Sequence, residues 1–210
     1  MKVAFPFKRF PVFIVHTTYA HGFFDSVGFV VLTPGYEEDS YLIEHETAHA
    51  YWHPPELWRE TPQIDGVSLT PFIWIFEGAA TLMDRLASDS LHTAPAQPGD
   101  TGCSFAESIG ELDQRVFNPD ESFLKNLYRS RCNYTMGLGM FAALYHRLGD
   151  DEFRRGFGSL SLKIRNLEHE DQCTGVGTGI CYVRKAFVDE ASPGFAEAAG
   201  EVIDLWYYGR

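Results

Sequence analysis

Residues 45–49 read HETAH, and this pentapeptide decides how the rest of the chain is interpreted. It is an HExxH pattern, in which two histidines lie four residues apart and a glutamate directly follows the first. Residues four apart share one face of a helix, so the imidazoles of His45 and His49 can reach one metal ion. Neutral imidazoles suit Zn²⁺, and Glu46 then approaches the coordination position that the protein leaves open. The simpler alternative is a pair of helix histidines that bind nothing.

The flanking residues predict the helix that this pattern requires. Ser40 is the expected N-cap, and apolar side chains recur at helical spacing over residues 41–51. Pro54-Pro55 ends the helix. His53 continues the row of histidines, but it precedes a proline and lies about 6 Å further along the helix axis than His49. We therefore expect His53 to be structural or peripheral.

A third metal ligand must come from another part of the chain, and Glu77 is the strongest candidate. Thr70-Pro71 predicts the start of a strongly apolar helix that runs from Phe72 to about Ala87. A carboxylate among such neighbours is costly to bury unless it is paired, hydrogen bonded or bound to a metal. A glutamate on a solvent-facing helix surface is the alternative, but the apolar residues on both sides of Glu77 argue against it.

The remaining pattern predicts an α+β domain, with strands near the N-terminus and helices over the second half. The apolar runs Phe10–Val15 and Gly28–Leu32 are expected strands, and Ser88–Gly102 is an expected surface loop. Gly149 and Asp150 are expected to cap two consecutive helices. Apolar stripes predict helices over Phe105–Phe117, Glu121–Arg131, Tyr134–Leu148, Asp151–Leu160 and Ser192 to about Tyr208.

The composition is that of one folded domain of 210 residues, with 45% hydrophobic and 22% charged residues. The β-rich part with the HExxH helix covers about residues 1–56, and the mainly helical part covers about residues 57–210. No uncharged stretch reaches the roughly 20 apolar residues of a membrane span. The net charge of −12 argues against nucleic acid or an anionic membrane as partner. The oligomeric state stays open.

Four cysteines, Cys103, Cys132, Cys173 and Cys181, allow three disulfide pairings. Cys173 and Cys181 bracket a glycine-rich stretch, which is typical of a loop closed by a bridge. Four buried thiols are the alternative. The cellular compartment therefore depends on the state of the cysteines. Disulfides imply a secreted or extracytoplasmic protein, and free thiols imply a cytoplasmic one.

Three segments together resemble the gluzincin zinc peptidases, and most of all the catalytic domain of the aminopeptidase N family. HETAH is followed by Trp-x-x-Glu-Gly-x-Ala at residues 74–80, and residues 134–137 then read Tyr-x-x-Gly. The resemblance covers about Gly28 to Phe157. It implies a thermolysin-like zincin fold, with the HExxH helix at the junction of a small N-terminal β-sheet lobe and a mainly helical C-terminal half. It also implies that Tyr134 donates a hydrogen bond to the oxyanion of the reaction.

The chain departs from this family at the strand before HETAH. The family has a Gly-x-Met-Glu-Asn segment there, whose glutamate holds the free amine of the substrate. Residues 26–32 read SVGFVVL and contain neither glutamate nor asparagine. The backbone of Gly28 and Phe29, as an edge strand, remains a candidate for pairing with an extended peptide, and Asp25 or a loop acid is a possible substitute for the glutamate. The choice between aminopeptidase and endopeptidase therefore stays open.

The expected function is hydrolysis of peptide bonds in a peptide or protein substrate by a zinc metallopeptidase. His45, His49 and Glu77 are the expected ligands of one Zn²⁺. Glu46 is the expected general base, and Tyr134 the expected oxyanion stabiliser.

Two further residues and two rival functions complete the prediction. Thr81 and Asp84, on the same predicted helix as Glu77, are candidate hydrogen-bond partners for the zinc-binding histidines. An Asp84 that faces solvent is the alternative. One rival function is a zinc hydrolase of a non-peptide substrate on the same scaffold. The other is a catalytically silent, metal-stabilised interaction domain, although an intact Glu46 has no use in a purely structural site.

Overall fold

The computed structural model describes residues 12–15, 22–25, 29–36, 38–49, 63–64, 67–68, 73–103, 123–166, 173 and 178–209. The strands are β1 (Val12–Ile14), β2 (Gly22–Asp25), β3 (Phe29–Leu32), β4 (Gln63–Ile64) and β5 (Val67–Ser68). The α-helices are α1 (Ser40–Ala48), α3 (Ile73–Ala87), α5 (Phe123–Leu148), α6 (Asp150–Asn166), α7 (Thr178–Arg184) and α8 (Ala196–Tyr208). The expected α+β class with a mainly helical second half is confirmed.

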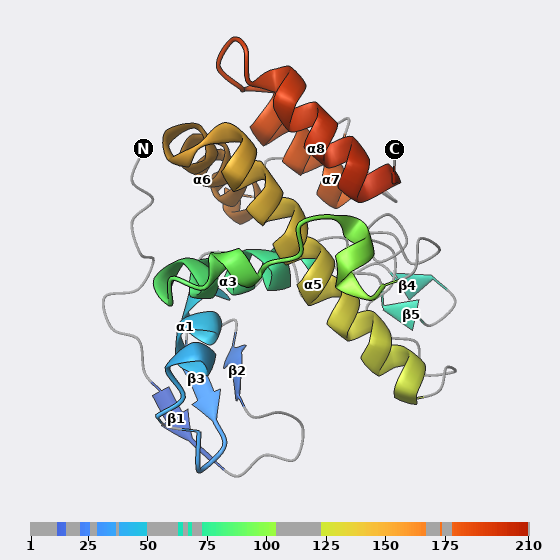
Figure 1. Ribbon diagram of the computed structural model, residues 1–210. Coiled ribbons are helices and arrows are strands. Elements are labelled where there is room, and N and C mark those ends of the chain that lie inside the picture. The colour runs from blue at the N-terminus through green and yellow to red at the C-terminus, as the bar shows by residue number, and fades with distance from the viewer. Residues whose placement is uncertain are drawn as a thin grey trace.

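Two long helices, α3 and α5, cross near the middle of the molecule (Figure 1). The three-stranded sheet and α1 lie on one side of this crossing, and α6, α7 and α8 lie on the other. The largest buried side chains gather around it: Trp74 stacks on Phe141 with ring centroids 6.1 Å apart, and Phe76, Phe187 and Trp206 are also fully buried. Burial of aromatic surface on this scale is the main favourable term in holding two helices together. Within the described residues, no helix has both the length and the apolar character needed to span a membrane.

The N-terminal sheet has the strand order β1–β3–β2, with β1 parallel and β2 antiparallel to β3. The expectation that the strand before HETAH lies at a sheet edge is therefore wrong. Val30 pairs with a residue on each side, and Phe29 pairs with Asp25 of β2. The reason is the β2 segment, which reads GFFD, is too short to stand out in the sequence, and covers one edge of β3. Gly28, the other residue of that expectation, lies outside the described residues.

The HExxH helix forms as expected, with one change at its start. Asp39 is the N-cap instead of Ser40, and its carboxylate accepts a hydrogen bond from the backbone N–H of Leu42 at 3.1 Å. An ionised cap also suits the positive end of the helix dipole better than a hydroxyl does. The helix ends at Ala48, and His49 as C-cap keeps helical torsions (φ −56°, ψ −26°). Both histidines of the pattern therefore stay on one helical turn. Pro54-Pro55, the expected stop, lies outside the described residues.

The expected apolar helix around Glu77 is confirmed over Ile73–Ala87 as α3, and Thr70-Pro71, its expected start, lies outside the described residues. The helix α5 corrects the prediction of two separate helices. α5 runs without a break from Phe123 to Leu148, so Tyr134 lies inside it and not at its start. Residues 132 and 133 are cysteine and asparagine, which lower helix propensity only slightly and break no helix. Gly149 ends α5 in a left-handed conformation (φ 78°), as expected, and Asp150 is already the first residue of α6 instead of its cap.

The remaining differences concern turns and helix ends. The expected loop 88–102 contains two short 3₁₀ turns, η2 (Leu91–Thr93) and η3 (Pro98–Thr101). A π-helical segment, η5 (Lys185–Asp189), follows α7, and the last helix begins at Ala196 instead of Ser192. The expected helix over residues 105–117 lies outside the described residues.

All four cysteines are paired, as Cys103–Cys132 and Cys173–Cys181. The Cα atoms are 5.9 Å and 5.5 Å apart, within the usual range for a disulfide. The predicted bridge around the glycine-rich stretch is confirmed, and the alternative of four thiols is wrong. The two disulfides are compatible with an extracytoplasmic compartment.

The crossing of α3 and α5 requires glycine on both helices. A Cβ atom at Gly78 would lie 2.5 Å from the Cα and carbonyl carbon of Gly137, and one at Gly137 would lie 2.2 Å from the carbonyl oxygen of Trp74. Real Cβ atoms do not approach backbone so closely, so the two backbones touch with no side chain between them. Because Glu77 precedes Gly78 and Tyr134 lies one turn before Gly137, this contact sets the distance between the two candidate site residues.

Gly137→Ala should therefore lower the free energy of unfolding by at least about 1–3 kcal/mol, because the overpacked helices must move apart. Gly200→Ala is the matched control. Gly200 lies inside α8, and a Cβ atom there meets nothing within 4 Å, so alanine should raise the free energy of unfolding by up to about 1 kcal/mol. Urea unfolding followed by circular dichroism measures both changes. A Gly137→Ala protein as stable as the wild type would contradict the close crossing.

Candidate metal centre

Three side chains from two helices converge at the junction of α1 and α3. His45 and His49 lie one turn apart on α1, and Glu77 faces them from α3. The Nε2 atoms of the two histidines are 3.2 Å apart, and each lies 3.3 Å from Oε2 of Glu77. Both histidines are buried, and the side chain of Glu77 is 13% exposed. The structure thus brings together the three ligands that the sequence predicts.

The triangle formed by these three atoms has the dimensions of one face of a zinc coordination tetrahedron. Zn–N and Zn–O bonds of about 2.0–2.1 Å at tetrahedral angles place neighbouring ligand atoms about 3.3–3.4 Å apart. The observed sides of 3.2, 3.3 and 3.3 Å match this spacing without any movement of the chain. Two imidazole nitrogens and one carboxylate oxygen are also the donor set of a catalytic zinc site, which keeps a fourth position open. The residues present therefore fit Zn²⁺.

The charges within the triangle favour a cation. Burial by itself raises the pKa of the Glu77 carboxyl, but the two histidines outweigh burial and hold that pKa well below its usual range. Burial by itself lowers the pKa of His49, and the Glu77 carboxylate outweighs burial and raises it. Glu77 is thus a buried carboxylate ion, and its charge attracts a cation. Protonation of either histidine competes with a metal ion for this charge, because a metal-binding imidazole must be neutral.

Two buried polar groups lie beside the triangle. Among the described residues, Nδ1 of His45 is buried without a hydrogen-bond partner, and the buried Asp84 carboxylate interacts with the Tyr41 hydroxyl. Asp84 is fully buried on α3, and it interacts electrostatically with His45. An imidazole that binds a metal through Nε2 carries its proton on Nδ1, and a carboxylate is the usual acceptor of that proton. The described residues show an electrostatic interaction between Asp84 and His45 but no hydrogen bond between them, so the role of Asp84 as acceptor stays a prediction.

Glu46 and Tyr134 face the same space as the three ligands. Glu46 is buried, and its charge helps to raise the pKa of both His49 and Tyr134. The ring of Tyr134 stacks on that of His45, with centroids 5.6 Å apart and planes 21° from parallel. Burial first, and then the carboxylates of Glu77 and Glu46, raise the pKa of the Tyr134 hydroxyl far above its usual value. This hydroxyl therefore keeps its proton and acts as a hydrogen-bond donor.

Of the other expected residues, Thr81 does not fill its role. Its hydroxyl donates to the backbone carbonyl of Glu77 at 2.7 Å, so it is not a partner of the histidines. A threonine inside a helix commonly binds the carbonyl four residues earlier, and here this local bond prevails. His53 and Gly28 lie outside the described residues. Asp25 belongs to β2, which packs against α1.

Tyr41 is the site neighbour that sequence reasoning missed. Its ring stacks on that of His45, with centroids 6.4 Å apart, and the Arg85 guanidinium lies 5.4 Å from the Tyr41 ring centroid. Burial first, and then the Asp84 carboxylate, raise the pKa of the Tyr41 hydroxyl. The signal was present in the sequence, because Tyr41 lies four residues before His45 and therefore on the same helix face.

Asp84→Asn should weaken zinc binding by about 10-fold to 100-fold, because the proton on His45 loses its charged acceptor. The metal-free variant should be at least as stable as the wild type at pH 7. Burial raises the pKa of the Asp84 carboxyl from 3.8 to about 6, so its ionisation destabilises the fold as the pH rises through about 6. Asparagine removes this cost. Competition with a chromophoric chelator measures the affinity, and thermal unfolding at pH 5 and 7 measures the stability.

Asp89→Asn is the matched control for this prediction. It removes one acidic charge five residues away, at an exposed position where φ is 53° and asparagine is tolerated. Its zinc affinity should equal that of the wild type. An Asp84→Asn protein with unchanged affinity would show that another group orients His45.

Comparison of the chain with protein-family models, with curated proteins and with solved structures finds no match. The case for a function therefore rests on the sequence motifs and on the geometry of this site.

Proposed function

We propose that the protein is a zinc-dependent metallopeptidase. The observation that carries the proposal is the triangle of His45, His49 and Glu77, whose sides equal the ligand spacing of tetrahedral zinc. A purely structural zinc site is normally closed by four protein ligands, whereas three ligands with an adjacent acid and a hydroxyl donor suit hydrolysis. Glu46 and Tyr134 supply this acid and this donor.

In the proposed reaction, His45, His49 and Glu77 hold the zinc ion. The ion, when bound, supplies Lewis acidity that lowers the pKa of water and polarises a carbonyl group. Glu46 takes the proton from the attacking water and then delivers it to the nitrogen of the leaving amine. The position of Glu46 suits this role, because it directly follows the ligand His45 and faces the other site residues.

Whereas Glu46 acts on the attacking water, Tyr134 acts on the carbonyl oxygen of the scissile bond. As negative charge grows on this oxygen, the Tyr134 hydroxyl donates a hydrogen bond to it. The high pKa of the hydroxyl secures the proton, and the contact with the His45 ring fixes the ring of the donor. A donor held in place before the reaction needs no reorganisation when the charge develops.

The proposal includes the thermolysin-like fold and the resemblance to the aminopeptidase N family. In support, a small sheet lies before the HExxH helix, and the Glu-Gly and Tyr-x-x-Gly segments meet at one helix crossing. The glycines of these two segments are the ones in backbone contact. The substrate is a peptide or a protein, and the edge strand β2, which packs against α1, is the candidate for backbone pairing in place of Gly28 and Phe29.

The test combines metal analysis with cleavage of a mixed peptide library read by mass spectrometry. The proposal predicts one zinc per chain and cleavage that a chelator abolishes and zinc restores. Zinc with turnover of esters but of no peptide would favour the non-peptide hydrolase, and zinc without any turnover would favour the silent interaction domain. A chain that binds no zinc would overturn the assignment. The library also shows whether a free N-terminal amine is required.

Glu46→Gln should lower kcat by about 10²–10⁴-fold, because an amide cannot accept the proton of the attacking water. Zinc content should stay at one per chain, since Glu46 is not a ligand. Glu44→Gln is the control, because Glu44 lies on the same helix with an exposed side chain, and it should retain wild-type turnover. Loss of zinc in a folded Glu46→Gln protein would show that ligand and base have been confused. Peptide assays with parallel metal analysis decide between these results.

Tyr134→Phe should lower kcat and kcat/KM in similar proportion, by about 10²–10³-fold, because the lost hydrogen bond forms mainly in the transition state. Folding and zinc content should not change, since the ring still packs against His45. Tyr145→Phe is the control: Tyr145 lies on the same helix, and its hydroxyl bonds Asp150 instead of the site. A Tyr134→Phe enzyme with wild-type turnover would remove the tyrosine from the reaction.

A further inference from the structure

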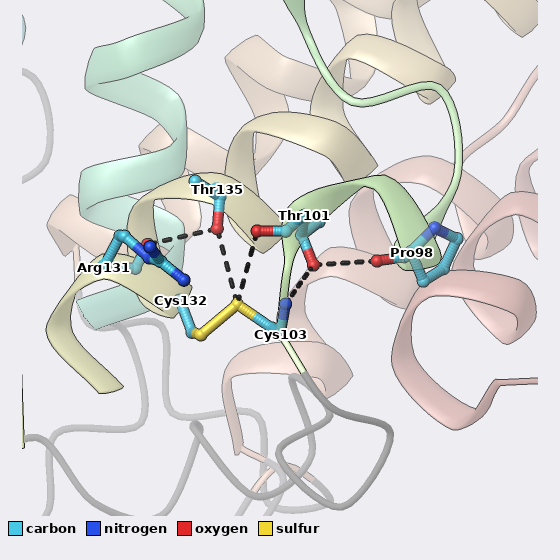
Figure 2. Close-up of a disulfide and its surroundings, with 6 residues drawn as sticks. All are labelled: Pro98, Thr101, Cys103, Arg131, Cys132 and Thr135. Atoms are coloured by element: carbon cyan, nitrogen blue, oxygen red, sulfur yellow. Dashed lines mark hydrogen bonds between the residues drawn. A yellow bond between two sulfur atoms is a disulfide. The ribbon is translucent and has the colours of Figure 1, made fainter. Parts of the chain in front are cut away.

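The Cys103–Cys132 disulfide joins the loop before α5 to the helical turn that carries Tyr134. Cys132 lies two residues before Tyr134 and is fully buried. Figure 2 shows the bridge between the end of the 3₁₀ turn η3 and this turn of α5. The bridge therefore anchors α5 directly beside a candidate catalytic residue, on the N-terminal side.

The loop end of this disulfide is itself well fixed. The backbone N–H of Cys103 donates to the Thr101 hydroxyl oxygen at 3.0 Å, and that hydroxyl donates to the carbonyl oxygen of Pro98 at 2.8 Å (Figure 2). Asp100 and Gln97 form reciprocal hydrogen bonds at the start of the same turn. The disulfide thus joins α5 to a short turn that is itself fixed by hydrogen bonds. It can therefore restrict the movement of the α5 turn at Cys132.

The same disulfide touches α5 on both sides of Tyr134. Sγ of Cys103 lies 3.6 Å from the hydroxyl oxygen of Thr135, and that hydroxyl donates to the carbonyl oxygen of Arg131 at 3.1 Å. Beyond Thr135, the next fixed point is Gly137, which is in backbone contact with Gly78. Tyr134 is therefore held between a covalent anchor and a backbone contact, within six residues of one helix.

Positioning at this level matters for a hydrogen-bond donor. A misplacement of about 1 Å in a catalytic group is enough to cost about 100-fold in rate. The stacking of Tyr134 on His45 restricts the orientation of the Tyr134 ring. The position of the α5 turn that carries this ring depends on the backbone. Of the two disulfides, Cys103–Cys132 lies beside Tyr134, whereas Cys173–Cys181 ties α7 to residue 173, which is remote in sequence from every candidate site residue.

We propose that Cys103 and Cys132 are positioning residues for Tyr134: their disulfide fixes the turn of α5 so that the hydroxyl faces Glu77 and Glu46. The catalytic consequence rests on the proposed function, whereas the effect on the α5 turn stands by itself.

The first test measures amide hydrogen exchange in the 210-residue chain, without and with zinc. In Cys103→Ser/Cys132→Ser, amides over residues 131–138 should exchange at least about tenfold faster than in the wild type, because this turn opens locally. The control is Cys173→Ser/Cys181→Ser, in which the same amides should exchange within about twofold of the wild-type rate. Unchanged exchange in the first variant, or equal acceleration in both, overturns the proposal.

The second test is kinetic and separates positioning from general structure. Loss of Cys103–Cys132 should lower kcat by about 10-fold to 100-fold, with KM and zinc content nearly unchanged. In a Tyr134→Phe background the same loss should have an effect of less than about threefold, because the hydroxyl to be positioned is already absent. A full additional loss in that background would mean that the disulfide acts through the whole fold, and would overturn the proposal.

If the zinc-loaded wild type hydrolyses no peptide, the proposed function fails and hydrogen exchange alone decides the positioning. If the serine pair does not fold, Cys103→Ala/Cys132→Val replaces it, since valine suits the buried Cys132 position. Unfolding of both pairs at 25 °C overturns the proposal, because the disulfide would then be a requirement of the whole fold.

Discussion

The backbone contact between Gly78 and Gly137 is the constraint on which the site depends. It lets α3 and α5 cross with no side chain between them, at the centre of the buried aromatic cluster. Glu77 lies immediately before one glycine and Tyr134 one turn before the other. A candidate metal ligand and a candidate hydroxyl donor from distant parts of the chain are thereby brought next to α1. The function that we propose needs this placement more than it needs any property of the individual helices.

The second constraint is electrostatic. Glu77 is an ionised carboxylate in a largely buried position, and Asp84 is a fully buried carboxyl on the same helix. Buried carboxylates are costly unless a cation or donors balance them. In the metal-free chain the two histidines balance Glu77, while Asp84 interacts electrostatically with Arg85 and His45. In the function that we propose, one divalent ion held by the triangle would balance Glu77, and its binding would then stabilise the fold.

The sequence predicts the parts of this site that depend on local periodicity. The HExxH helix, the apolar helix around Glu77 and the disulfide around the glycine-rich stretch all follow from spacing within a few residues. Predictions failed where the outcome depends on distant contacts. The edge position of β3 was wrong because the short β2 covers it, and the break before Tyr134 was wrong because packing against α3 carries α5 through residues of modest helix propensity. The sequence identified Asp84 only as a candidate hydrogen-bond partner of the histidines. The burial of a single polar side chain in a helix cannot be predicted from the sequence pattern.

The most direct test of the account is zinc K-edge X-ray absorption on the chain loaded with one equivalent of zinc. The account predicts a tetrahedral ion with two imidazole nitrogens and two oxygens, one from Glu77 and one from solvent, at about 2.0–2.1 Å. The Glu77→Ala protein should lose the carboxylate contribution and bind zinc more weakly. Sulfur in the coordination shell, a third imidazole, or no defined zinc site would contradict the assignment of His45, His49 and Glu77 as the metal ligands.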